Sequence, residues 1–156
     1  MVDRSNNRIV LISIRPDLAE AILAGSKTVE LRRSAISDEA TLFVVYATAP
    51  VSAIVGWFES AKIQIDAPNG LWDRYGSLTG IIRSEFDGYF AGAQTGFAIE
   101  VKSTTRVEPP VPLADVPAVK RAPQSFQYLD SAAFTQITGS TADWYQQARL
   151  HSLPGD

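Results

Sequence analysis

The stretch from Leu11 to Arg33 constrains the fold of this chain more than any other. It reads as a strand, a short helix, a tight turn and a second strand that carries charges. Pro16 suits the first helical position, where the missing N–H has no partner to lose. Gly25 stands where a helix end favours a positive φ. The rest of the chain is expected to be organised around this strand–helix–strand unit.

The second strand of this unit, Lys27–Arg33, alternates in chemistry. Val29 and Leu31 point to one face, and the other face carries Thr28, Glu30 and Arg32. Between Ala24 and Ser34 there are three cations and one anion, a local charge of +2 in a chain of net charge -3. Arg33 falls on the apolar side of the alternation, so we expect it at the strand end or on a rim.

Short elements are predicted along the remaining chain. Apolar and alternating runs predict strands at Arg8–Ile14, Thr41–Ala47, Ala53–Ser60 with an extension over Lys62–Ile65, and Gly96–Lys102. Helices are predicted at Leu71–Tyr75, Thr79–Phe90 and Thr141–Leu150. A glycine inside the strand Ala53–Ser60, Gly56, predicts a bulge or the close approach of another backbone.

Two segments near the end of the chain are less regular. Four prolines lie in Val107–Val119, which predicts an extended segment without regular structure. Arg121–Leu129 reads as a turn into a short helix. The strands do not alternate with long helices, so the predicted fold class is α+β, a small mixed β-barrel of five to six strands flanked by short helices.

Composition limits the classes of function. The 156 residues, 46% of them hydrophobic, suffice for one domain spanning 1–156 with a real core. The net charge of -3 argues against a broad phosphate-binding surface, although a few bases in a pocket need only a local positive field. No apolar run approaches the roughly 18 residues of a membrane span, so we expect a soluble cytoplasmic protein without a membrane partner.

Metal and cofactor chemistry is not expected. The chain has no cysteine and one histidine, His151, which cannot by itself anchor a zinc site or a catalytic triad. No H-x-x-H, HExxH, Walker or GxGxxG string is present. We therefore predict no metal site and no cofactor.

Several strings in order resemble the ASCH domain, a branch of the PUA-like superfamily. The first holds Gly25, Lys27, Thr28, Glu30, Arg32 and Arg33. It is followed by Tyr46–Pro50 with Gly56 downstream, by Phe86-x-x-Tyr89-Phe90-x-Gly92, by Gly96–Glu100 and by Pro123–Leu129. The resemblance covers about residues 9–129 and implies a PUA-like barrel with a cleft between the charged strand and the flanking helices.

The resemblance also implies a class of partner. ASCH domains are mostly regarded as RNA- or nucleotide-binding modules, and a few are enzymes, either amidohydrolases acting on acetylated cytidine or ribonucleases. The deacetylating members use a lysine, a threonine two residues before the strand arginine, and a downstream glutamate. Here Lys27 matches the lysine, Glu30 occupies the threonine position, and only Asp73 stands near the place of the glutamate. If the protein is an enzyme, Lys27 and Glu30 are the candidate catalytic residues.

Each candidate ligand-binding residue has a structural alternative. Lys27 could contact a phosphate or base, or be a solvated turn lysine. Glu30 and Arg32 could read a base edge in a cleft, or form a structural ion pair, which would contribute little to stability if it is exposed. The aromatic candidates could stack on bases or belong to the core, namely Tyr46, Trp72 and Tyr89. Gln124 and Ser125 could close one side of the cleft or cap a helix.

Three hypotheses remain from the sequence. The first is a module that holds RNA, a nucleotide or a modified nucleoside beside the charged strand. The second is a hydrolase, an amidohydrolase or a ribonuclease. The third is a protein-interaction module that uses the proline-rich segment Val107–Val119 as its docking surface.

Overall fold

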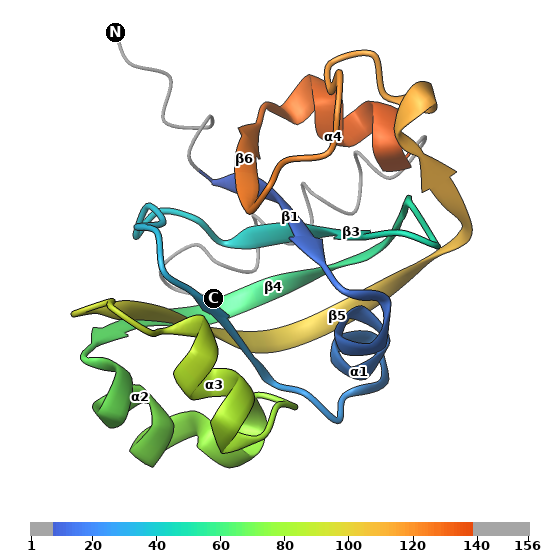
Figure 1. The fold of residues 1–156 in the computed structure, drawn as a ribbon. Coiled ribbons are helices and arrows are strands. Elements are labelled where there is room, and N and C mark those ends of the chain that lie inside the picture. Colours follow the sequence, from blue (N-terminus) through green and yellow to red (C-terminus); the bar gives the residue numbers. More distant parts are fainter. Residues whose placement is uncertain (1–7, 139–156) are drawn as a thin grey trace, which may run out of the picture.

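The computed structural model describes residues 8–138, in which six strands form one curled, mixed sheet (Figure 1). The strand order is β2-β5-β4-β3-β1-β6, so β2 and β6 are the two edges of an open half-barrel. Only β1 and β3 run parallel; the other neighbours are antiparallel. The strands are β1 (Ile9–Ile14), β2 (Val29–Arg32), β3 (Leu42–Ala47), β4 (Ala53–Asp66), β5 (Gly96–Pro112) and β6 (Phe126–Leu129).

Four α-helices and two short 3-10 helices accompany the sheet within residues 8–138. They are α1 (Pro16–Ala24), α2 (Pro68–Tyr75), α3 (Arg83–Tyr89) and α4 (Ser131–Thr138), with 3-10 turns η2 (Gly76–Leu78) and η3 (Leu113–Asp115). This confirms the expected α+β class with a small mixed barrel. None of the helices in the described part of the chain is long and apolar enough to cross a membrane. The predicted helix Thr141–Leu150 and His151 lie outside the described residues.

Helices cover both faces of the sheet at β1 and β3. On β1, Ile9 and Leu11 pack in the cluster that includes Phe134 of α4, while Val10 and Ile12 pack in the cluster that contains residues of α1. Successive strand residues point to opposite faces, so a strand buried on both sides must be apolar throughout. The uniformly apolar runs in these strands have this cause.

The helices α2 and α3 cover the other end of the sheet, where β2 pairs with β5 (Figure 1). Val29 and Leu31 of β2 pack against Leu71, Phe86 and Phe90 in a third cluster. Glu30 is paired with Ile99, which belongs to the cluster on the α1 side of the sheet. The predicted alternation in β2 is therefore confirmed, with its apolar side chains under α2 and α3 and its charged ones on the opposite face.

Two predictions for the C-terminal part are wrong. The segment Arg121–Leu129 does not end in a helix, because Phe126–Leu129 form β6 and use the free edge of β1. The segment Val107–Val119 is not wholly irregular, because β5 continues to Pro112 in pairing with β4. The prolines Pro109 and Pro110 fall where the register between the two strands shifts, the kind of place that tolerates a missing N–H.

The predicted helix Thr79–Phe90 is shorter in the structure. Its first residues form a turn in which the Thr79 hydroxyl donates to Gly76 O at 2.8 Å, and Gly80 has a φ of 76°. A positive φ interrupts a right-handed helix. The helix α3 consequently begins only at Arg83, and the turn before it is free to contact the charged strand.

Gly56 confirms the prediction of a close approach. A Cβ at this position would meet the backbone oxygen of Thr105 and would lie 2.8 and 3.2 Å from the two terminal carbons of Leu23. The register between β4 and β5 also shifts between Ile54 and Gly56. Glycine therefore allows α1 to lie directly on the sheet.

The substitution Gly56→Ala should lower the free energy of unfolding by about 1–3 kcal/mol, the usual effect of overpacking. Urea unfolding followed by circular dichroism measures the change. Gly88→Ala in α3 is the matched control, because nothing lies within 4 Å of the added Cβ; it should be neutral or stabilising by up to about 1 kcal/mol. Equal stability of the two variants would contradict the close approach.

Candidate functional site

A buried ion network lies on the charged face of β2. Its members are Lys27, Glu30 and Arg32, which are only 2%, 4% and 9% exposed to solvent. The alternative of a solvated turn lysine is therefore wrong, and the structural ion pair between Glu30 and Arg32 is present but buried. The two cations exceed the one carboxylate, so the network keeps an excess of one positive charge.

The ammonium group of Lys27 is fully occupied. Its Nζ donates to the carbonyl of Val29 at 2.7 Å and to the carbonyl of Thr79, and it lies 3.1 Å from Oε1 of Glu30. An ammonium has three N–H donors, so these three acceptors use all of them. Lys27 thereby joins the turn after η2 to the charged strand.

Only some of the N–H donors of the Arg32 guanidinium have partners. Its Nη1 donates to the Glu30 carboxylate and, at 2.8 Å, to the carbonyl of Leu31, and its Nη2 donates to the carbonyl of Ser13 at 2.6 Å. Its Nε is buried and has no hydrogen-bond partner among residues 8–138. Arg32 thus crosses from β2 to the end of β1 and keeps unpaired donor capacity at Nε.

Glu30 holds the network together electrostatically. Burial by itself would raise the pKa of its carboxyl, but the charges of Arg32 and Lys27 and their hydrogen bonds lower that pKa below the ordinary value of 4.5. Glu30 is therefore ionised at neutral pH. Its two oxygens face different cations, which fixes the orientation of the carboxylate.

A cavity of about 340 Å³ opens beside this network. Its walls come from the end of β1, from α1, from β2, from α3 and the turn before it, and from the loop that precedes β6. The volume lies within the range of about 300–1,000 Å³ that is typical of small-molecule sites. The polar side chains of the lining are Ser13, Arg15, Lys27, Glu30, Arg32, Glu85, Tyr89, Gln124 and Ser125.

Six of the nine candidate ligand-binding residues meet at this cavity. They are Lys27, Glu30, Arg32, Tyr89, Gln124 and Ser125. Tyr89 is anchored on the rim, because its hydroxyl accepts from the backbone N–H of Arg33 and its carbonyl accepts from Nη1 of the same residue, both at 3.2 Å. Arg33 is exposed directly after β2, which confirms its expected place at the strand end.

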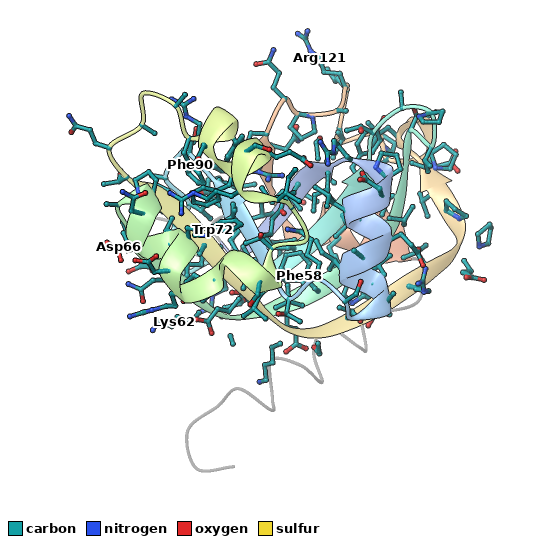
Figure 2. All side chains as sticks on the ribbon, turned by 60° about the horizontal axis from the view of Figure 1, so that its bottom comes forward. Phe58, Lys62, Asp66, Trp72, Phe90 and Arg121 are labelled. Atoms are coloured by element: carbon teal, nitrogen blue, oxygen red, sulfur yellow. The ribbon has the colours of Figure 1, made fainter. Side chains whose placement is uncertain are left out.

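The other three candidates lie elsewhere. Tyr46 is buried among the core residues on the α4 side of the sheet, opposite the face that carries Glu30. Thr28 is absent from the cavity lining; the regular alternation begins only at Val29, and Lys27 takes the place beside Glu30. Trp72, labelled on α2 in Figure 2, packs with Phe86 and Phe90 and lines a different pocket.

Three polar lining residues were missed by the sequence analysis, namely Ser13, Arg15 and Glu85. Ser13 lies inside an apolar strand, and nothing in its neighbours indicates that it ends at a cavity. Glu85 could have been found, because it lies four residues before Tyr89 and so shares its helix face. It pairs with Arg15 at 3.4 Å, which joins α3 to the start of α1 across the cavity mouth.

Within the described ranges of the chain, no group of three or more histidine, aspartate or glutamate side chains is placed to hold a metal ion. The cavity chemistry comes instead from a positive network, amide and hydroxyl groups, and one aromatic ring. Such a set can accept an anionic or strongly hydrogen-bonding planar ligand.

Removing the central carboxylate should be strongly destabilising. Glu30→Gln leaves two buried cations without a counter-charge and should lower the free energy of unfolding by about 3–5 kcal/mol. Glu20→Gln is the matched control, because Glu20 pairs with Arg106 at 2.6 Å on the surface and exposed pairs contribute little. Urea titration of both variants tests this, and similar losses in the two would refute the central role of Glu30.

The Glu30 carboxylate should also make the free energy of unfolding depend on pH. Because the folded-state pKa of Glu30 is lowered below 4.5, its contribution is complete above that pH and is lost as the pH falls below it. The difference in unfolding free energy between wild type and Glu30→Gln should therefore shrink from about pH 5 to about pH 3. Urea titrations across this interval measure it, and a constant difference would contradict the expectation.

Comparison with known proteins identifies close relatives in sequence and structure. A protein of Zymomonas mobilis named ASCH domain-containing ribonuclease is 31% identical over 146 residues, which are 91% of this chain and 98% of that protein. A crystal structure of ASCH from Zymomonas mobilis matches with a TM-score of 0.78 and 27% identity, covering 86% of this chain and 96% of the other. No family model matches the chain.

A more distant structure shares the fold alone. The N-terminal domain of McrB from Staphylothermus marinus matches with a TM-score of 0.57 at 12% identity, over 90% of this chain and 98% of that domain. The Zymomonas mobilis relative, by contrast, is similar along nearly the whole length of both proteins. This chain therefore belongs to the ASCH domain family and has its PUA-like α+β fold.

Proposed function

We propose that the cavity beside Lys27, Glu30 and Arg32 binds one nucleotide of a single-stranded RNA. The unpaired donor capacity of Arg32 carries the proposal. Arg32 lines the cavity, and its Nη2 has two N–H groups of which one donates, to the carbonyl of Ser13, so an acceptor on a ligand can take the other. The excess positive charge of the network favours the same ligand, because RNA brings both negative charge and planar acceptor edges.

The rim supplies groups suited to a base. Tyr89 offers an aromatic ring at the cavity mouth, and bases exposed in single strands stack on such rings. Gln124 carries both a donor and an acceptor, which suits a base edge, and Ser125 carries a hydroxyl. Glu30 can still accept from an exocyclic amine, because each carboxylate oxygen has a further lone-pair site.

RNA as the ligand class is supported by the relatives. The Zymomonas mobilis protein is named a ribonuclease, and this chain matches 98% of its length. A ribonuclease and an RNA-binding module both have to hold RNA, so the same cavity would serve either. The acidic net charge of -3 favours recognition of a few nucleotides over a long phosphate track.

Cleavage of RNA is the second candidate, favoured by the name of that relative. The arrangement of Lys27 gives it little support as a general base, because a neutral amine keeps only two N–H donors and would lose at least one of its three existing interactions. The deacetylase alternative is weakened for the same reason. A binding module is accordingly the function that the geometry supports best.

The expected outcome is that mononucleotides and short single-stranded RNA raise the melting temperature, by mass action on the native state. Gln124→Ala removes an exposed rim amide and should weaken binding about threefold to tenfold, the range of one hydrogen bond. Arg32→Lys keeps the charge near Glu30 but removes the guanidinium and its spare N–H donor on Nη2, and should also weaken binding. Calorimetric titration measures both affinities.

Gln94→Ala is the matched control, since Gln94 is exposed in the turn before β5 and lies outside the cavity lining. It should bind like wild type. Absence of binding by all nucleotides, or unchanged affinity in both Gln124→Ala and Arg32→Lys, would refute the proposal. Mass spectrometry of the same mixtures distinguishes the alternatives: shortened RNA indicates a ribonuclease, and loss of an acetyl group from acetylated cytidine indicates an amidohydrolase.

A further inference from the structure

A second pocket lies beside the first, on the side formed by α2, η2 and the start of α3. It has a volume of about 560 Å³ and is lined by Trp72, Arg74, Ile81 and Arg83 among others. Ile81 also lines the cavity beside the ion network. The two pockets therefore share one lining residue and lie next to each other.

Arg83 forms a fixed platform in this second pocket. Its guanidinium carbon lies 5.3 Å from the ring centroid of Trp72 and 5.9 Å from that of Phe86. Its Nε donates to Asp87 and its Nη2 to Asn69, both at 2.9 Å. The cation–π contact with Trp72 and the two lateral hydrogen bonds restrain the guanidinium, while its side chain remains 45% exposed.

The Trp72 ring beneath it is also held firmly. A Cβ on Gly76 would lie 2.8 Å from two atoms of the indole, so the ring rests directly on the backbone there. Phe86 packs against it with a centroid distance of 5.0 Å. A platform fixed before binding loses little conformational freedom when a ligand stacks on it.

We propose that the second pocket binds the nucleotide adjacent to the one in the first cavity, with its base stacked on the exposed side of Arg83. Bases stack on guanidinium planes as they do on aromatic rings. Arg74 lines the same pocket and supplies a cation for a phosphate. This inference rests on the proposed function, because the first nucleotide must occupy the cavity beside Arg32.

The test compares nucleotides of different length. The four ribonucleoside 5′-monophosphates and their single-stranded homotrinucleotides are titrated calorimetrically into the full chain. In wild type, at least one trinucleotide should bind roughly tenfold more tightly than its monophosphate, within the range of one stacked base. Arg83→Gln should abolish most of this gain and leave the monophosphate affinity unchanged.

Two further variants sharpen the result. Arg83→Lys keeps the positive charge but loses the planar group, so it should lose the gain as Arg83→Gln does; if it retains the gain, charge alone explains binding and the stacked base is refuted. Arg8→Gln is the matched control, because Arg8 is exposed before β1 and lines neither pocket. It should keep the full gain.

The failure of this inference is distinct from failure of the proposed function. If the monophosphate binds in an Arg32-dependent manner but the trinucleotide gains nothing, or if the gain survives in Arg83→Gln, the second site is refuted and the first stands. If neither monophosphates nor trinucleotides bind to wild type, both are refuted.

Discussion

The burial of two cations around a single carboxylate is the constraint on which the arrangement of this domain depends. Charges removed from water are tolerated only where partners with good geometry replace the water. Lys27 donates to the carbonyl of Thr79 in the turn after η2, and Arg32 donates to the carbonyl of Ser13 at the end of β1. The network consequently fixes two parts of the chain against β2 at the same time, and the cavity is the space left between them.

The same network explains why an acidic protein has a positive interior site. Surface charges are screened by water and salt over about 10 Å, whereas buried charges are screened much less. The excess positive charge of Lys27 and Arg32 over Glu30 therefore dominates the cavity although the chain as a whole is negative. Net charge alone would have been a poor guide to the charge of this cavity.

Sequence patterns predicted those parts of the fold that depend on local periodicity. The apolar runs of β1 and β3, the alternation in β2 and the glycine at the end of α1 each follow from short-range rules, and Gly25 has the expected positive φ of 89°. The family resemblance added six residues that line the cavity. The local rules concern residues that are close together in the sequence, and the resemblance concerns residues that match a motif of the family.

The errors arose where distant contacts decide the structure. The burial of Lys27 depends on the Thr79 carbonyl, which lies 52 positions away, and no local pattern indicates it. Phe126–Leu129 became a strand because β1 has a free edge, which is a property of the sheet. The helix α4 is different: Asp130 accepts from the backbone N–H of Ala133 at 2.7 Å, so a capping signal before an apolar stripe was present and was missed.

Four of the acceptors in the ion network are backbone carbonyls, those of Ser13, Val29, Leu31 and Thr79. Every amino acid carries a carbonyl, so the side chains at these four positions can change while the acceptors remain. Only Lys27, Glu30 and Arg32 are tied to their chemical identity. Homologous proteins could therefore differ in the residues around the cavity, and in any ligand they prefer, while keeping the same ion network.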